Sequence, residues 1–478
     1  MTGECPDLRD LEQIHRIVAE TCFPTTAPTV PTSLHVGVEL ESFPIRLAPD
    51  GTPAGRVPID ELRHLLDPPL DPPLAGARAV PGPDAAWHLD GGGALTFEPG
   101  GQIEHSTRHH PGPAAALAEV GAVAAALGEL LEPEGVVLAT AGIDVWAGGA
   151  AQQLASPRYP AMAAYLAARG PYGAVMMRDT CALQVNLDLG PPADTGERWL
   201  VANLAAPIAC ATFAASPAPN AGRGFAPVRE GPEAAGRGLR VASGRALAWQ
   251  RLDPTRTGFP AALVDGSSDD PVAQLTAAAL DADVLLVRRP GSCWWPGRPG
   301  WTFADWLRDG HPEHGPPSGD DLRYHLTTLF LEVRPRGFLE VRAVDALPAG
   351  LRAVPVVLLA GLLDDARARA QVRAVLEPYR ARLPALWARA AADAVADPEL
   401  CALAVETWSF ALAGAGRLPP GHLPPGALAQ AEAFLDRFTM RGRCPADELR
   451  AALAEGPAQA LAWAAQPVAA GETSDIAR

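Results

Sequence analysis

Four short segments of the sequence alternate acidic or amide residues with aliphatic ones. In the segment 338–343 (FLEVRA), a period of two places Glu340 and Arg342 on one face of a strand, opposite three apolar side chains. The segments 35–43, 102–106 and 183–189 repeat this arrangement. Their polar faces carry Glu39 and Glu41; Gln102, Glu104 and Ser106; and Gln184, Asn186 and Asp188.

These polar faces predict a metal site if the four strands belong to one curved sheet. Carboxylates that converge in such a sheet repel one another, so cations must lie between them. Hard oxygen ligands suit Mg²⁺ or Mn²⁺ rather than zinc. We therefore expect a magnesium–nucleotide site on the concave face of the sheet. For any single strand, the alternative is an antiparallel sheet with one face in water.

Turn signals indicate how the second acidic strand is positioned. Residues 95–106 are predicted to form a hairpin, in which Pro99 and Gly100 occupy the central positions of a type II turn. This turn places Glu98 at the end of one strand and Glu104 on the next. A plain hairpin explains the Pro-Gly-Gly sequence but not the polar residues that share one face.

Other segments are predicted to support or reach this site. Residues 158–169 are expected to form a helix, and residues 175–189 a strand. In the stretch that follows a Gly/Arg-rich loop at 218–242, three arginines could reach an anionic substrate or a phosphate: Arg245, Arg251 and Arg256.

The composition excludes several classes of protein. The chain has 478 residues, of which 20% are charged, and its net charge of −16 with dispersed basic residues makes nucleic-acid binding unlikely. All 39 basic residues are arginine. Because P-loop NTPases, protein kinases and pyridoxal enzymes need a lysine, they are excluded. Arginines and metal ions must therefore bind any phosphates.

The cysteines and the apolar segments indicate a cytoplasmic protein. The seven cysteines are scattered and never form a CxxC pair, which favours reduced thiols over disulfides or a zinc site. The N-terminus lacks the pattern of a signal peptide. The longest apolar runs, at 204–215 and 354–363, are too short to span a membrane.

Composition and hydrophobic pattern divide the chain into four parts. Residues 1–33 are expected to form an N-terminal helix and tether, and residues 34–349 a catalytic core built on the antiparallel sheet. Residues 350–465, rich in Ala, Leu, Arg and Glu at helical spacing, are expected to form a helical region packed on the core. Residues 466–478 are expected to be a flexible tail.

These motifs together resemble the plant-type glutamate–cysteine ligase family. The resemblance rests on GVELE at 37–41, EPGGQIEHS at 98–106, QVNLD at 184–188 and the block 327–342. Two further motifs, DPTRTG at 253–258 and RGRCPADE at 441–448, are similar to the ergothioneine-pathway branch of the family. The resemblance extends over about residues 34 to 450, with the motifs in the family's order.

The resemblance implies an α+β fold of glutamine-synthetase-like type. Its curved, funnel-like antiparallel β-sheet would carry the active site, with helices on the outer face and a C-terminal helical region. The implied reaction joins L-glutamate to L-cysteine through a γ-glutamyl phosphate, as the first step of ergothioneine synthesis. It would use ATP and two or more Mg²⁺ ions, with Mn²⁺ as an alternative.

The resemblance also implies roles for individual residues. Glu340 and Arg342 would be catalytic. The metal ligands would be Glu39, Glu41, Glu98, Glu104 and Glu340. The nucleotide would be bound by Arg334, Arg336 and Arg342. Substrate contacts would come from Gln102, Gln184, Asn186, Arg245 and Arg256.

Three alternative functions remain open at this stage. A ligase of the same fold could use a different amine, and the charged pair Arg178-Asp179 leaves the acceptor undecided. A catalytically inactive relative could bind a metabolite and regulate. It would have no need for several unpaired carboxylates in one cavity, where they are costly. A phosphotransferase acting on a guanidino group is disfavoured, because the EPGGQ motif does not fit that group.

Overall fold

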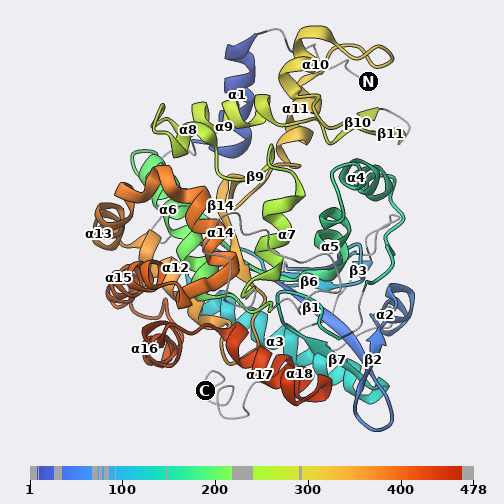
Figure 1. The fold of residues 1–478 in the computed structure, drawn as a ribbon, viewed down its shortest axis with the longest axis vertical. Coiled ribbons are helices and arrows are strands. Elements are labelled where there is room, and N and C mark those ends of the chain that lie inside the picture. The colour runs from blue at the N-terminus through green and yellow to red at the C-terminus, as the bar shows by residue number, and fades with distance from the viewer. Residues whose placement is uncertain are drawn as a thin grey trace, which may run out of the picture.

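The computed structural model describes residues 8, 10–25, 35–66, 74, 78–79, 86–91, 93–146, 149–217, 241–289 and 293–465 (Figure 1). The expected tether within 26–33, most of the loop at 218–242 and the tail at 466–478 lie outside these residues. Within them, a mostly antiparallel sheet is surrounded by helices. The predicted α+β class with an antiparallel sheet is confirmed.

A ten-stranded sheet forms the centre of the molecule. Its main path runs in the order β13-β14-β8-β1-β6-β5-β4-β3, and both β2 and β7 pair with the far half of the long strand β1. All of these pairings are antiparallel. The strands are β1 (Val36–Leu47), β2 (Pro53–Arg56), β3 (Arg78–Ala79), β4 (Ala86–His88), β5 (Ala94–Phe97), β6 (Ile103–Ser106), β7 (Val136–Ala139), β8 (Ala182–Asp188), β13 (Val333–Pro335) and β14 (Phe338–Asp345).

The four acidic strands are direct neighbours in this sheet. Strands β14, β8, β1 and β6 follow one another, and their register aligns the polar positions. Glu41 lies opposite Glu104, and Glu39 lies opposite Gln184. Glu340 lies opposite Asn186 on β8. The prediction that these strands bring their polar faces together is therefore confirmed.

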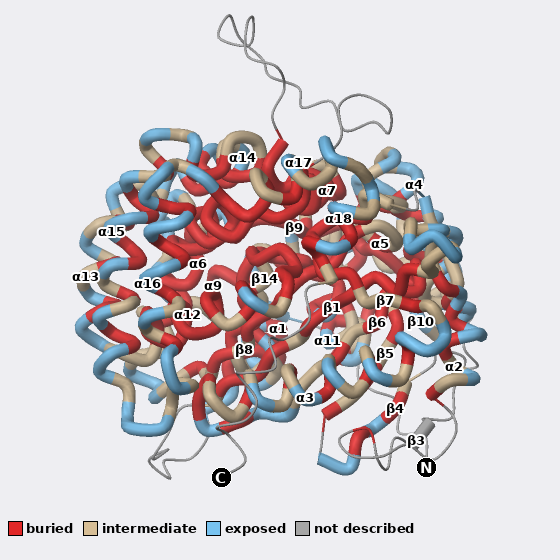
Figure 2. The backbone as a smooth tube through the Cα atoms, turned by 90° about the horizontal axis from the view of Figure 1, so that it is seen from below, coloured by how far each residue is buried: buried red, intermediate tan, exposed pale blue. Residues whose placement is uncertain are grey.

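Helices cover the apolar face of the sheet. Helix α6 packs on β13 and β14, α12 on β8, and α3 on β1 and β7. These helices are α3 (Pro113–Leu131), α6 (Thr195–Thr212) and α12 (Ala353–Asp364). The side of α6 and α12 toward the sheet is buried, whereas α13 (Ala366–Leu376) and α15 (Pro398–Ala415) also expose residues at the outer surface (Figure 2).

Three shorter helices lie over the other, polar face. They are α4 (Arg158–Ala167), α5 (Tyr172–Asp179) and α7 (Gly244–Leu252), and α5 packs on both α4 and α7. A further layer joins the N-terminal helix to the middle of the chain, because α1 packs on α9 and α11 (Figure 1). Its elements are α1 (Leu11–Cys22), α8 (Ala261–Val264), α9 (Pro271–Asp281), α10 (Phe303–Asp309), α11 (Gly319–Leu326), and the strand pairs β10 (Leu286–Arg289) with β11 (Cys293–Pro296) and β9 (Thr257–Gly258) with β12 (Phe330–Leu331).

The C-terminal part of the chain is helical over its described length. Helices α14 and α15 pack on α6, while α17 packs on α18. The remaining helices are α2 (Ile59–Leu66), α14 (Leu383–Asp393), α16 (Ala427–Arg437), α17 (Pro445–Glu455) and α18 (Pro457–Ala464). The domain boundaries at 33, 349 and 465 remain a prediction.

Among the described residues, one helical stretch, Pro113–Glu134, is long and apolar enough to cross a membrane by length and composition alone. Its apolar face lies on the sheet, where Val120, Val123 and Leu127 are buried. Core helices of the same length and composition meet the same criterion, so this stretch is weak support for a membrane span.

Two local predictions are wrong. Residues 175–179 were predicted as the start of a strand, but they form the end of helix α5. The prediction failed because a short apolar run beside a strand is compatible with either a strand or a buried helix. The turn after Glu98 is not type II. The positive φ of +86° falls on Gly101 instead of Gly100, while the Gly101 amide donates to the Glu98 carbonyl at 2.8 Å.

Candidate active site

A cavity of about 230 Å³ lies between the polar face of the sheet and helices α4, α5 and α7. The strands contribute its charged wall, and the helices contribute most of its apolar wall. The lining residues are Glu39, Glu41, Glu98, Gln102, Glu104, Arg158, Tyr159, Met162, Met176, Thr180, Ala182, Gln184, Arg245, Trp249, Phe330, Arg334, Arg336 and Arg342.

Three carboxylates in this cavity are close enough to share a metal ion. Glu41, Glu98 and Glu104 each offer an oxygen, and these oxygens all lie within 4.8 Å of one another. Glu104 accepts a hydrogen bond from the Thr96 hydroxyl at 2.9 Å, and Glu41 accepts one from the Ala182 amide at 2.8 Å. The neighbouring strands thus fix two of the three carboxylates in place.

The carboxylates of this cluster are harder to ionise than ordinary glutamates. Burial raises the pKa of Glu41 to about 7, although Arg245 acts against it. Burial, reinforced by the charge of Glu41, raises the pKa of Glu104 to about 7. Burial and the charge of Glu104 also raise the pKa of Glu98 well above its ordinary value. A cation between the three oxygens would relieve both effects, so this donor set fits a hard divalent ion.

Glu39 lies at the boundary between this cavity and a larger one of about 950 Å³. Its carboxylate accepts a hydrogen bond from the Asn186 amide at 2.9 Å. Burial and the charges of Glu104 and Glu340 raise the pKa of Glu39 to about 7. Asn186, which the sequence placed among the substrate contacts, lines only the larger cavity.

Glu340 has a different environment, because three arginines surround its carboxylate. It accepts hydrogen bonds from Arg334 at 2.9 Å, from Arg336 at 3.0 Å and from Arg342 at 3.0 Å. Burial alone would raise the pKa of Glu340, but the guanidinium groups of Arg334 and Arg342 hold it well below its ordinary value. Glu340 is therefore an ionised group paired with arginines, outside the cluster of three carboxylates.

Arg342 connects this ion pair to the carboxylate cluster. Its Nη1 donates to Gln184 Oε1 at 2.6 Å, and the Gln184 amide donates onward to Glu41 at 3.3 Å. Its guanidinium also lies over the ring of Trp249, 5.2 Å from the centroid. Gln184 therefore contacts a metal-ligand candidate and an arginine at once, in a fixed orientation.

Two further residues predicted to contact substrate line the cavity. Gln102 is almost fully buried, and its amide donates to the Thr180 carbonyl at 2.9 Å, while no described residue donates to its Oε1. Arg245 lies 3.6 Å from Asp345 and donates to the backbone carbonyl of Arg342. Gln102 is therefore held by the residue at the end of α5, and Arg245, on α7, is held by strand β14.

Arg256 does not reach the cavity, and the expectation that it contacts substrate is wrong for this structure. It is fully buried and pairs with Asp253 at 2.7 Å. It also donates to the carbonyls of Thr328 and Asp283. All three guanidinium nitrogens therefore have protein partners. Arg256 joins the start of β9 to the segments that carry Thr328 and Asp283.

The sequence did not indicate the apolar wall of the cavity. Tyr159 and Met162 come from α4, and Met176 comes from α5, the helix that was predicted as a strand. Trp249 carried a usable signal, because it follows Arg245 by four residues and such pairs lie on one face of a helix.

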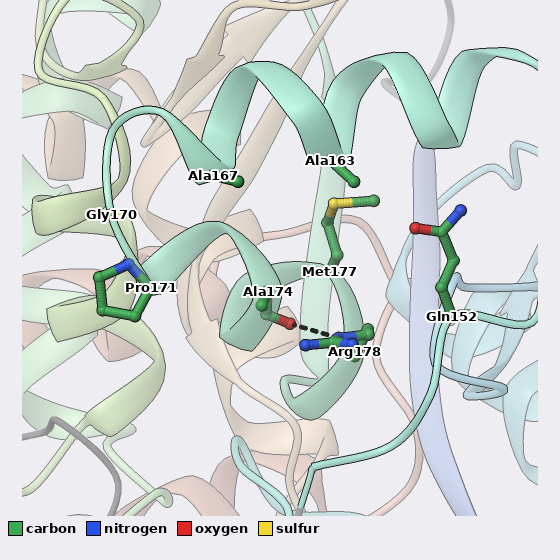
Figure 3. A pocket seen from close by; sticks show the side chains of 8 residues that line it. All are labelled: Gln152, Ala163, Ala167, Gly170, Pro171, Ala174, Met177 and Arg178. Atoms are coloured by element: carbon green, nitrogen blue, oxygen red, sulfur yellow. Dashed lines mark hydrogen bonds between the residues drawn. The ribbon is translucent and has the colours of Figure 1, made fainter.

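A third cavity, of about 540 Å³, lies between α4 and α5 (Figure 3). Small residues form most of its lining, among them Ala163, Ala167 and Ala174. Arg178 and Gln152 supply its polar groups, and Arg178 Nε donates to the Ala174 carbonyl at 3.2 Å. Helices α4 and α5 therefore line this cavity as well as the carboxylate cavity.

Comparison with known proteins gives one family and a set of relatives. The family model for "Glutamate-cysteine ligase family 2(GCS2)" matches residues 35–471. Glutamate–cysteine ligase EgtA of Mycolicibacterium smegmatis is 33% identical over 394 residues, which are 80% of this chain and 83% of the relative. The chloroplastic glutamate–cysteine ligase of Medicago truncatula is 30% identical over 57% of this chain and 51% of the relative.

A solved structure gives a weaker likeness. The glutamate–cysteine ligase of Francisella tularensis, solved in complex with AMP, superposes with a TM-score of 0.48 at 14% identity. The superposition covers 90% of this chain and 87% of that chain.

Proposed function

This chain belongs to glutamate–cysteine ligase family 2, and from that premise we propose that it forms γ-glutamylcysteine from L-glutamate and L-cysteine, with cleavage of ATP to ADP and phosphate. The observation that carries this proposal is the cluster of Glu41, Glu98 and Glu104 beside a group of arginines in one cavity. Such a site can bind a polyanion and a carboxylate together without a nucleophilic side chain.

The first step transfers the γ-phosphoryl group of ATP to the γ-carboxylate of glutamate. A carboxylate oxygen attacks the γ-phosphorus, the bond to the bridging oxygen breaks, and ADP leaves. Both reactants are anions, so Arg334, Arg336 and Arg342 favour the step by binding phosphoryl oxygens. Metal ions held by the carboxylate cluster would supply further charge neutralisation on these oxygens.

The arginines around Glu340 connect nucleotide binding to metal binding. In the free protein, these three guanidinium groups pair with Glu340. Triphosphate oxygens would compete with Glu340 for them, and the Glu340 carboxylate would then be able to hold a metal ion. We place the nucleoside in the larger cavity, because it adjoins the carboxylate cavity at Glu39.

The second step joins the amine to the activated acyl group. The amine nitrogen attacks the acyl carbon, phosphate leaves, and one proton is lost from nitrogen. We assign the acceptor to the part of the cavity near Gln102, because the orientation of its amide leaves Oε1 free to accept from an N–H group. Holding the amine beside the acyl phosphate replaces an encounter in solution.

The test is ADP release by the purified protein with Mg²⁺, ATP, L-glutamate and one amine at a time, with product masses recorded. We expect cysteine to stimulate release and γ-glutamylcysteine to appear. Glu104→Gln is expected to abolish turnover, whereas Glu61→Gln, at a surface pair with Arg46, is the matched control. ADP release with another amine would move the assignment to a ligase with a different acceptor, and bound nucleotide without ADP release would favour the regulatory alternative.

We further propose that the product enters ergothioneine synthesis and that the reaction takes place in the cytoplasm. The first part rests on the motifs at 253–258 and 441–448 and on the likeness to EgtA. Mg²⁺ is the proposed physiological ion and Mn²⁺ its substitute, because the donor set is made of oxygen alone.

A further inference from the structure

Arg56, at the end of strand β2, lies outside the carboxylate cavity but contacts two of its walls. Its Nη1 donates to the Gly100 carbonyl at 3.0 Å, in the turn that carries Glu98 and Gln102. Its Nη2 donates to the Arg178 carbonyl at 2.8 Å, in the last turn of α5. One guanidinium group therefore joins the turn of the metal-site hairpin to the helix on the opposite side.

The turn and the helix approach each other more closely than side chains allow. A Cβ on Gly100 would lie 2.3 Å from the Arg178 carbonyl oxygen. Two carbonyl groups thus face the same small space and need donors there, and the Gly100 carbonyl accepts from the Gln153 amide at 3.0 Å as well as from Arg56. The planar fork of an arginine supplies two parallel donors, which a lysine does not.

Arg56 itself is held in one orientation. Its Nε donates to Asp144 at 2.8 Å, Asp179 lies 3.5 Å from its Nη2, and its guanidinium lies over the ring of Phe43 at 4.4 Å. Its side chain is only 5% exposed. The orientation of the Arg56 guanidinium group is therefore set by the carboxylates of Asp144 and Asp179 and by the Phe43 ring.

Other contacts also hold α5: it packs on α4 and α7, and the Asp144 amide donates to the Asp179 carbonyl at 2.9 Å. The cavity of about 540 Å³ lies between α4 and α5, where Ala174 and Met177 face Ala163 and Ala167 (Figure 3). The opposite side of α5 carries Met176, which lines the carboxylate cavity. The polar contacts at the last turn of α5 therefore add to its packing on α4 and α7 in fixing its position.

From these contacts we propose that Arg56 is a positioning residue, which holds the Glu98–Gln102 turn against the end of α5 and so sets the separation of the carboxylate cluster from the acceptor wall. Arg56 touches neither the cluster nor the cavity. Its effect on the reaction passes through the backbone of Gly100 and Arg178. The connection to catalysis rests on the proposed function, whereas the effect on metal binding does not.

The experiment measures Mn²⁺ binding by electron paramagnetic resonance, which needs no turnover, and ADP release in parallel. In Arg56→Ala we expect the Mn²⁺ affinity to fall about tenfold or more, as for other residues that orient metal ligands. The Mg²⁺ concentration needed for half-maximal ADP release is expected to rise by a similar factor. Arg46→Ala, which removes a surface arginine of β1 that bonds Glu61 and the Glu134 carbonyl, is the matched control.

Two further measurements separate positioning from general destabilisation. Millimolar guanidinium is expected to restore Mn²⁺ affinity in Arg56→Ala but not in Glu104→Gln, and Arg56→Lys is expected to recover only part of it. If Arg56→Ala does not fold, Asp144→Asn loosens the same guanidinium from its far side and is expected to weaken Mn²⁺ binding in the same direction. Mn²⁺ affinity in Arg56→Ala or Asp144→Asn equal to that of Arg46→Ala would overturn the proposal. Wild-type protein that binds Mn²⁺ but releases no ADP would instead overturn the proposed function.

Discussion

Binding of a divalent cation to the carboxylate cluster is expected to release protons and to strengthen as the pH rises. Burial raises the pKa of Glu41 and of Glu104 to about 7. At neutral pH, each of these groups is therefore protonated for about half of the time. A metal ion binds the ionised carboxylates and must displace these protons.

The magnitude follows from the two pKa values. For one ligand with a pKa of about 7, the ionised fraction rises from roughly a tenth at pH 6 to roughly nine tenths at pH 8, so the affinity rises about tenfold. If both protons must leave, the factor approaches about 100, or ~2.7 kcal/mol. Because the charge of Glu41 raises the pKa of Glu104, the two protons leave in coupled steps, and the measured factor shows whether one or both of them are displaced.

Without the cation, the same carboxylates affect stability in the opposite sense. Their pKa in the folded protein lies above the ordinary value of 4.5. Their contribution to stability is therefore fully present below that value and is lost as the pH rises through about 7. Mn²⁺ is expected to raise the thermal unfolding midpoint more at pH 8 than at pH 6.

The assay is calorimetric titration with Mn²⁺ at pH 6, 7 and 8, each in two buffers of different ionisation enthalpy, so that released protons are counted. Glu104→Gln is expected to release fewer protons than the wild type, and Glu61→Gln, at an exposed position, the same number. Equal dissociation constants at pH 6 and pH 8, with no proton release at pH 7, would refute the reasoning about the cluster.

Three other predictions test the remaining parts of the site and its support. Glu340→Gln leaves three arginines without their shared anion and is expected to lower kcat at least about 100-fold in the ADP-release assay; near-normal turnover would remove Glu340 from the site. Gly100→Ala places a Cβ 2.3 Å from the Arg178 carbonyl and is expected to lower the free energy of unfolding in urea by about 1–3 kcal/mol. In Gly128→Ala, in helix α3, nothing lies within 4 Å of the new Cβ, and the free energy of unfolding is expected to rise by about 0.5–1 kcal/mol. Similar changes in the two variants would contradict the close approach of Gly100 to the Arg178 carbonyl. Arg256→Leu leaves Asp253 without its buried partner and is expected to lower the free energy of unfolding by roughly 3–5 kcal/mol in the same urea titration, with little change in KM. An unchanged free energy of unfolding with a raised KM would instead indicate that Arg256 contacts substrate.

The alternation of polar and apolar residues predicted the acidic strands and their shared face correctly. A period of two determines which side chains point to the same side of a strand, whatever the partner. That Arg334 and Glu340 lie opposite each other could also have been predicted. Gly337, with a φ of +80°, makes the turn between β13 and β14 short enough to pair them.

Helix α5 and the buried arginines could not be predicted in the same way. The run Val175-Met176-Met177 is apolar in either a strand or a helix, and only the cavity that it covers decides between them. The sequence did not indicate that Arg256 and Arg56 are buried, because a lone arginine is usually exposed. Their burial depends on carboxylates and carbonyls that are distant in sequence, such as Asp144 for Arg56.

The protein neutralises the acidic residues of the site in two different ways, and this difference indicates an order of binding. Glu340 is neutralised by arginines, which hold its pKa low and occupy its oxygens. The cluster of Glu41, Glu98 and Glu104 is neutralised in part by protons, because burial raises the pKa of each carboxyl, and a metal ion that binds the cluster displaces these protons. We therefore expect the cluster to bind a metal ion before nucleotide. We expect Glu340 to join the metal site only after triphosphate oxygens have replaced it as the partner of its arginines.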